Sequence, residues 1–347
     1  MAYTVIDKST DYFNSVLYTG NGGTQNITGV GHQVDWTWIK HRGDTEGHGL
    51  FDVVRGALYR LQSSGTTVSS SQSGTVTAFG SDGFSIGNNA EVNANTASYV
   101  SWNWKAGTSF SNDASSTSVG SIDSSGSVST TSGFSIIKWS GANATSTVAH
   151  GLGVAPKVLL VKSLANTTTW MVQHTGIGNA KEIYLNNNSA SGNSTAWNST
   201  SPTTTVFTVT GGAGDGVNHS GDYIAYCFAE VKGFSKFGSY IGNANANGAF
   251  VYTGFKPAWI LIKSTGAGES WQILDNKRST FNPADDILMA DLTNAESAVS
   301  GRATDFVSNG FKFRGTEGGT NTTATYIYMA FAESPFVNSS GIPTTAR

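Results

Sequence analysis

The sequence predicts an all-β protein made of three tandem, homologous β-sandwich domains of jelly-roll-like topology, with little helix. Its composition places 42 glycines and many serines, threonines and asparagines among 9 Trp, 12 Tyr and 18 Phe. Turn formers that alternate with aromatic and β-branched runs are typical of β proteins. A short apolar phrase that ends in lysine occurs three times, and a second phrase follows each copy at a similar distance.

The first repeated phrase reads WTWIK, VLLVK and WILIK and ends at Lys40, Lys162 and Lys263. A glycine stands nine residues before each of these lysines. Both alternating faces of each run are apolar, which is typical of a strand that is covered on both sides. We therefore expect the three lysines to occupy equivalent strand positions.

The second phrase reads YVSWNWKA, YIAYCFAE and YIYMAFAE, and its tyrosine lies 59, 61 and 63 residues after the lysine. The second, fourth and sixth residues of the phrase are large and apolar, whereas the others, after the tyrosine, are smaller or more polar. This alternation predicts a closing strand with one core face and one lighter face. Trp104, Phe228 and Phe331 would then be equivalent core anchors.

The repeats divide the chain into six segments. They are a short arm (1–11), sandwich 1 (12–106), a Gly/Ser/Thr-rich linker (107–132), sandwich 2 (133–231), sandwich 3 (232–333) and a C-terminal tail (334–347). This segment has few large apolar residues, so we expect a linker or an extended surface strap there. No spacer separates the last two sandwiches, and they should pack rigidly together.

Local signals predict two hairpins and one helix. Asp-Gly in 81–84 and Asn-Gly in 309–312 lie between extended runs, which is a strong hairpin signal. Within 282–296, Asn282 is placed as an N-cap and Pro283 as the first helical residue. This segment is the one predicted short helix.

Charge and hydropathy disfavour several classes of function. Only 12% of residues are charged and the formal net charge is −3, so we expect no nucleic-acid partner. No apolar run approaches the roughly 18 residues of a membrane helix, so we expect no membrane insertion. The first residues do not resemble a secretory signal. The single cysteine, Cys227, lies within an apolar strand and is expected to be a small buried residue.

One charged pair recurs at the same repeat position, as Asp52 with Arg55 and as Asp275 with Arg278. The second copy has histidine and isoleucine there instead. Two interpretations are open. With a neighbouring aromatic ring, the pair would hold a sugar by stacking and bidentate hydrogen bonds; alternatively, it is an ion pair that fixes a turn, and the second interpretation is simpler.

Three tryptophans are the candidates for ligand binding. Trp170 and Trp271 stand eight residues after their lysines, at the position of His48 in the first copy, and Trp197 lies in the polar segment 186–201. That segment and 63–74 are where the copies differ most, and loops on a rigid scaffold commonly carry recognition. Trp197 either offers a stacking surface or anchors its own loop.

The sequence singles out no catalytic residue, metal ligand or cofactor site. The spacing of His32, His41 and His48 matches no familiar metal motif, and no carboxylate pair stands out for glycoside hydrolysis. The string GFSIG at 83–87 matches G-x-S-x-G in its letters, but it begins in the predicted Asp-Gly hairpin and not at a strand-to-helix turn, so it is no nucleophile elbow. No phosphate-binding loop appears. We therefore expect a protein without enzymatic activity and without a cofactor.

Several phrases together suggest a family. VLYTGNG, GLGVAPKVLLVK, YIAYCFAEV, FSKFGSY, VYTGFKPAWILIK, YIYMAFAESPF and GIPTTAR resemble a repeat-built virion protein family of marine tailed bacteriophages. The resemblance covers nearly the whole chain, although the first copy has Val34 for a proline and WNWKA for the FAE phrase. It implies a structural or tail-fibre-like protein on the particle and transfers no catalytic residues.

Three functions follow from these observations. The first is a tail fibre or tail-tip adhesin that binds a host-surface glycan or protein; the second is a head decoration or cement protein. The third is a glycan-binding module or a glycan-degrading enzyme. For the first two we expect synthesis in the host cytoplasm, location on the virion surface, other virion proteins as partners and a homo-oligomeric state. Several similar sandwiches would multiply weak contacts.

Overall fold

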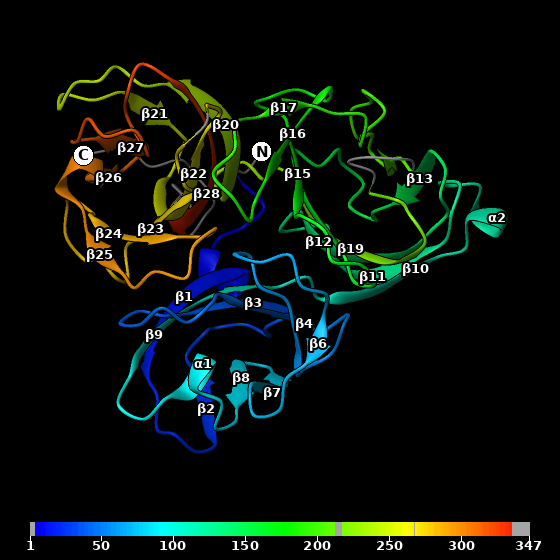
Figure 1. Ribbon diagram of the computed structural model, residues 1–347, viewed down its shortest axis with the longest axis horizontal. Helices are drawn as coiled ribbons and strands as arrows, with labels where there is room; N and C mark the ends of the chain where they lie inside the picture. Colours follow the sequence, from blue (N-terminus) through cyan, green and yellow to red (C-terminus); the bar gives the residue numbers. More distant parts are fainter. Residues whose placement is uncertain (1–3, 212–216, 267, 335–347) are drawn as a thin grey trace.

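A computed structural model describes residues 4–211, 217–266 and 268–334 and confirms the all-β class (Figure 1). Within this part of the chain, helix is confined to single turns: α1 (Ala90–Asn93), α2 (Ala114–Thr117), and the 3-10 turns η1 (Ser9–Asp11) and η2 (Ser300–Arg302). None of the described helices is long and apolar enough to cross a membrane.

Three antiparallel sheets share one strand order: an opening strand, the closing strand, the strand that carries the lysine, and the strand after it. The first is β1 (Phe13–Thr19), β9 (Ser98–Trp104), β3 (Trp36–His41) and β4 (Gly49–Asp52). The second contains β12 (Phe134–Gly141), β19 (Gly221–Phe228), β14 (Val158–Ser163) and β15 (Met171–His174). The third contains β20 (Ser235–Ile241), β28 (Thr325–Ser334), β22 (Lys256–Ser264) and β23 (Gln272–Asp275). Lys40, Lys162 and Lys263 hold one register, each opposite the second residue of the closing phrase.

A smaller antiparallel sheet faces each large one and makes a β-sandwich. These sheets are β2 (Gln25–Thr28), β8 (Gly83–Ile86) and β7 (Val76–Gly80); β13 (Ser146–Ala149) and β18 (Val206–Val209); and β21 (Phe250–Tyr252), β27 (Gly310–Phe313) and β26 (Thr304–Val307). A separate buried apolar cluster fills each sandwich. We call the parts from β1 to β9, from β10 (Thr108–Asn112) to β19 and from β20 to β28 lobes 1, 2 and 3.

Short strands complete the lobes. In lobe 1, β5 (Tyr59–Arg60) pairs with β6 (Ser70–Ser71), and α1 packs near β3. In lobe 2, β16 (Lys181–Tyr184) and β17 (Gly192–Asn193) extend the sheet; in lobe 3, β24 (Asp286–Met289) and β25 (Ser297–Ala298) do the same. Both predicted hairpins are present, as β7–β8 and β26–β27.

The closing strands contribute to two cores, so the predicted lighter face is wrong. Their second, fourth and sixth residues, including Trp104, Phe228 and Phe331, lie in one central core that all three lobes share. The alternate residues, among them Tyr99 and Cys227, fill the core of their own sandwich. The lobes surround the central core in Figure 1. Both faces of the strand are therefore covered.

Aromatic rings make much of this central core. Trp36 of lobe 1 stacks on Tyr226 of lobe 2, with ring centroids 4.5 Å apart. Trp104 of lobe 1 meets Trp259 of lobe 3 edge-on at 5.6 Å, and offset or edge-on pairs of this kind stabilise packing beyond their buried area. The lobes are thus joined through large buried side chains.

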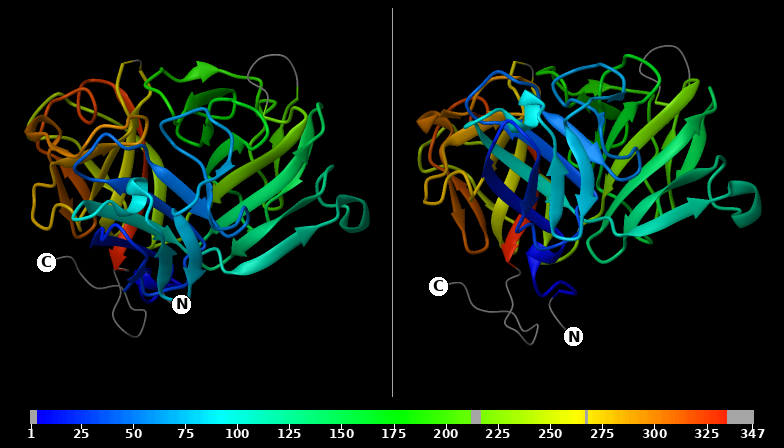
Figure 2. Two further views of the ribbon diagram at one scale, coloured as in Figure 1. Left: turned by 60° about the horizontal axis from the view of Figure 1, so that its bottom comes forward. Right: turned by 90° about the horizontal axis from the view of Figure 1, so that it is seen from below.

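The segment 107–132 is not a linker. It forms β10 (Thr108–Asn112), α2 and β11 (Ser124–Ser129), which add two strands beside β12 and make the large sheet of lobe 2 eight-stranded. Figure 2 shows this ribbon extending from the body. Backbone hydrogen bonds hold such a ribbon, and they do not require the large apolar side chains whose scarcity suggested a linker.

The predicted helix in 282–296 is also wrong, because β24 and β25 occupy this segment. Ile287 lies in the core of lobe 3, whereas Leu288 lies in the central core. Consecutive residues that enter cores on opposite sides require a strand. Of the predicted arm, residues 4–11 are described and Ile6 joins the central core; the predicted tail, apart from Ser334, lies outside the described residues.

Candidate functional site

Both Asp-x-x-Arg pairs are buried ion pairs that fix turns. The Nε of Arg55 donates to Oδ2 of Asp52 at 2.6 Å, and Arg278 does the same to Asp275 at 2.6 Å. Each Oδ1 accepts the backbone N–H of the same arginine. Because these carboxylates are almost fully buried, the pairs cannot hold a sugar at the surface. The structural interpretation is the correct one.

The same positions also join the lobes in a closed ring. Each lobe uses the residue twelve after its lysine to contact the closing strand of the next lobe. The contacts are Tyr226 Oη to Asp52 Oδ2 at 2.7 Å, His174 Nε2 to the Tyr328 carbonyl at 3.2 Å, and Trp102 Nε1 to Asp275 Oδ2 at 3.0 Å. Lobe 1 thereby meets lobe 2, lobe 2 meets lobe 3, and lobe 3 meets lobe 1.

Trp170 and Trp271 belong to a second ring and are not surface sites. They are buried, and their Nε1 atoms donate to the carbonyls of Gln62 in lobe 1 and Tyr184 in lobe 2, each at 2.8 Å. At the equivalent position, His48 Nε2 donates to a carbonyl of lobe 3 at 3.0 Å. An aromatic ring with one polar atom suits such a boundary, because its body is apolar and its N–H requires a partner.

Trp197, the third candidate, is wholly buried in the sandwich core of lobe 2. It anchors its loop and offers no stacking surface. The polar residues around it in the sequence conceal this, because one large apolar ring in a polar loop gains most by leaving water. None of the three tryptophans can therefore contact a ligand at the surface.

Two further residue types are structural. Lys40, Lys162 and Lys263 are buried, and each Nζ donates to backbone carbonyls of the turn that follows, such as that of Ser163 at 2.9 Å. Burial lowers the pKa of each lysine to about 8. Cys227 is buried as predicted, and burial raises the pKa of its thiol to about 12.

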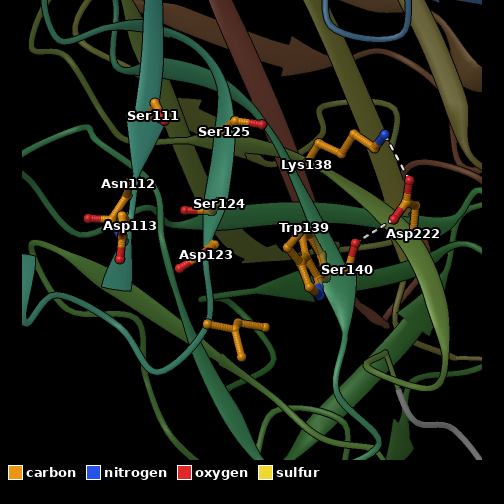
Figure 3. A pocket seen from close by; sticks show the side chains of 11 residues that line it. Ser111, Asn112, Asp113, Asp123, Ser124, Ser125, Lys138, Trp139, Ser140 and Asp222 are labelled. Carbon is orange, nitrogen blue, oxygen red and sulfur yellow. Dashed lines mark hydrogen bonds and ion pairs between the residues drawn. The ribbon is translucent and has the colours of Figure 1, made fainter. Parts of the chain in front are cut away.

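The candidate site is a polar hollow of about 650 Å³ in lobe 2 (Figure 3). The pairing of β11 with β12 stops at Ser125 opposite Lys138, although β12 continues to Gly141. Ile122 instead bridges to Val148 in the smaller sheet. The hollow opens where the two strands separate. It is lined by Ser111, Asn112, Asp113, Ile122, Asp123, Ser124, Ser125, Lys138, Trp139, Ser140 and Asp222.

One wall of the hollow carries a fixed carboxylate. Asp222 on β19 accepts from Lys138 Nζ at 2.8 Å and from Ser140 Oγ at 2.6 Å, the contacts dashed in Figure 3. These side-chain hydrogen bonds, from Lys138 first, lower the pKa of Asp222 despite partial burial. The carboxylate is therefore ionised and oriented at neutral pH.

Two more carboxylates come from the ribbon on the opposite side. Asp113 is the N-cap of α2 and accepts the backbone N–H groups of Ser115 and Ser116 at 3.0 and 3.1 Å. Asp123 accepts the N–H of Ala114 at 2.9 Å. Local turns thus hold both acidic groups beside the hollow.

This arrangement is suited to binding a polar molecule. Trp139 is only 2% exposed, and its ring packs into the core of lobe 2, so it offers no stacking face. Ser140 donates to Asp222, and neither a histidine nor a cysteine lines the hollow in the described structure. Within the described ranges, no three His, Cys, Asp or Glu residues are placed to hold a metal ion.

The sequence contained a signal for this site that its composition obscured. Asp113 and Asp123 are the two charged residues of a Ser/Gly/Thr-rich segment, and their capping and turn positions show that the segment is folded. Neither Lys138 nor Asp222 stood out, since each belongs to a repeated strand. The hollow forms only where the β10–β11 ribbon lies beside the repeated strands β12 and β19.

Fold and site define a three-lobed all-β protein with a polar hollow on lobe 2. The chain belongs to the family described as a domain of unknown function, DUF7483, which matches residues 8–335 and therefore spans all three lobes. Neither the curated proteins nor the solved structures contain a match to this sequence.

Proposed function

We propose that this chain is a non-enzymatic structural protein of a bacteriophage particle, and that it acts as a tail fibre or tail-tip adhesin on the host surface. The observation that carries the proposal is a rigid three-lobed scaffold that carries a polar hollow on lobe 2. The resemblance of its repeated phrases to phage virion proteins agrees with this function. Binding proteins commonly combine such a scaffold with a specialised surface segment.

Rigidity is supported by the contacts between lobes. The shared aromatic core and the two rings of buried hydrogen bonds tie each lobe to both others. A surface presented on such a body loses little conformational freedom on binding, which favours affinity.

Binding measurements on the purified full-length chain test the proposal. We expect binding to host cells and not to a non-host strain, without release of reducing ends from cell-envelope polysaccharide. Sugar release would contradict the non-enzymatic part of the proposal. Equal binding to host and non-host cells, or none to either, would contradict the adhesin part.

A head decoration protein is the second candidate, and the cyclic order of the lobes favours it. Three lobes with equivalent contacts surround one core, a shape that suits a site where three capsid subunits meet. Tight binding to purified capsid shells, without binding to cells, would favour this function over the adhesin.

A further inference from the structure

We propose that the hollow between β11 and β12 is a saccharide-binding site that takes neutral sugars through their hydroxyl groups. The inference rests on the proposed function as a surface-binding protein and names its ligand class.

The hollow is made by an insertion that only lobe 2 contains. In lobes 1 and 3 the opening strands β1 and β20 are at the edges of their sheets, whereas β12 is followed outward by β11 and β10. The walls that carry Asp113 and Asp123 therefore have no counterpart in the other lobes. A feature that departs from the repeat is not needed to build the repeat, and so it is available for recognition.

The separation of the strands leaves polar backbone open to a ligand. Trp139, Ser140 and Gly141 continue β12 beyond its last β11 partner, and they pair with β19 on the other side only. Backbone N–H and C=O groups require hydrogen-bond partners, and those directed into the hollow have no strand beside them. A sugar offers both donors and acceptors to such an edge.

The hydroxyl groups of two serines also line the hollow. Ser111 is opposite Ser125, and Ser125 is opposite Lys138, so the three side chains form a row across β10, β11 and β12 (Figure 3). Neither serine hydroxyl makes a side-chain hydrogen bond within the described structure, whereas Lys138 is held by Asp222. The two serine hydroxyls can accept or donate without breaking an internal side-chain contact.

Charge selects the class of sugar. Three carboxylates and one ammonium group line the hollow, which gives a formal charge of −2. This charge repels sulfated, phosphorylated or carboxylated glycans. Carboxylates retain acceptor sites beyond their present bonds and bind neighbouring hydroxyls strongly. With the ring of Trp139 buried, recognition depends on hydrogen bonds and not on stacking.

Saturation-transfer NMR on the full-length chain tests the site, with maltose, cellobiose, lactose and chitobiose as neutral probes and a sulfated heparin disaccharide as the anionic probe. We expect transfer to at least one neutral disaccharide and none to the sulfated one. Asp222→Asn and Ser125→Trp, which fills the hollow, should weaken binding by at least about tenfold. Asp305→Asn, which changes a half-buried aspartate paired with the exposed Arg314 in lobe 3, is the matched control and should bind as wild type.

Thermal unfolding of each variant shows that it is folded. No transfer to any neutral probe, wild-type binding by both hollow variants, or preference for the sulfated probe would overturn the proposal. Cell binding separates this result from the proposed function. Hollow variants that still bind host cells as wild type would place recognition elsewhere and leave the adhesin intact. Disaccharide binding by a chain that binds no cells would leave the site intact and reject the adhesin.

Discussion

At the scale of single residues, burial decides the role of each charged group. Asp52 and Asp305 are both paired with arginine at 2.6 Å, yet the first pair is enclosed and the second lies partly in water. Water screens an exposed pair and solvates either partner left alone. A buried arginine without its carboxylate has no such compensation.

Replacing Asp52 should therefore destabilise the protein strongly. We expect Asp52→Ala to lower the free energy of unfolding by about 3–5 kcal/mol, since Arg55 would remain buried without a carboxylate. Asp305→Ala is the comparison and should cost at most about 1 kcal/mol. Urea denaturation of the full chain measures both, and equal losses would show that Arg55 reaches solvent.

The repeated lysines predict a dependence of stability on pH. Burial lowers the pKa of Lys162 to about 8, below the ordinary value of 10.5 that it regains on unfolding. Between these values the unfolded chain binds more protons than the folded chain, so stability rises with pH. Buried tyrosines such as Tyr226, whose pKa burial raises above 10, reverse the trend at higher pH, which limits the window to pH 8–10.

Lys162→Met tests this dependence because methionine keeps the apolar stem and removes the charge. The rise in unfolding free energy from pH 8 to pH 10 should be smaller in this variant than in wild type. Lys157→Met, at an exposed position nearby, should leave the slope unchanged. An identical slope in all three proteins would mean that Lys162 is solvated when folded.

At the scale of elements, the closing strands explain how three lobes become one body. Trp104 on β9 contacts Phe13 of its own lobe and both Trp259 and Phe331 of lobe 3. The opposite face of β9 carries Tyr99 into the sandwich of lobe 1. One strand thus contributes to two cores, and neither face is free for solvent.

Truncation of a central anchor should be costly for this reason. We expect Trp104→Ala to destabilise the full chain by about 3–5 kcal/mol, with Phe228→Ala and Phe331→Ala in the same range. Leu17→Ala, on the exposed part of β1, is the control and should cost less than about 1 kcal/mol. Guanidinium denaturation of the intact protein gives these values. Changes below 1 kcal/mol for all three anchors would refute the shared core.

At the scale of the whole molecule, each lobe depends on the others. Lobe 1 contributes four tryptophans to the central core, which are Trp36, Trp38, Trp102 and Trp104. An isolated lobe would expose this face as a contiguous apolar patch, and patches of this kind drive association.

We therefore expect residues 4–106, expressed alone, to aggregate or to lack a cooperative unfolding transition. The full chain should unfold in a single transition by calorimetry, because its lobes share one core. A soluble isolated lobe with its own sharp transition, or three separate transitions in the full chain, would show that the lobes are independent.

The fold was predictable where the signal is local. Asp-Gly and Asn-Gly mark the two hairpins, because only certain residues accept the backbone of a tight turn. The spacing of Asp52 and Arg55 indicated a turn held by an ion pair, and this is what they form. The candidate site was harder to predict from the sequence. Trp170, Trp197 and Trp271 were the expected ligand residues, and all three are buried.

The sequence by itself determined the β class, the threefold repetition of strands and the residues at which they turn, since these depend on neighbours along the chain. The tertiary structure alone decided which core each face of a closing strand enters, because alternation reports that a face is buried and not what covers it. It also made the segment 107–132 a pair of strands and thereby created the hollow. Strand pairing depends on a backbone edge brought near by folding, which side-chain composition does not record.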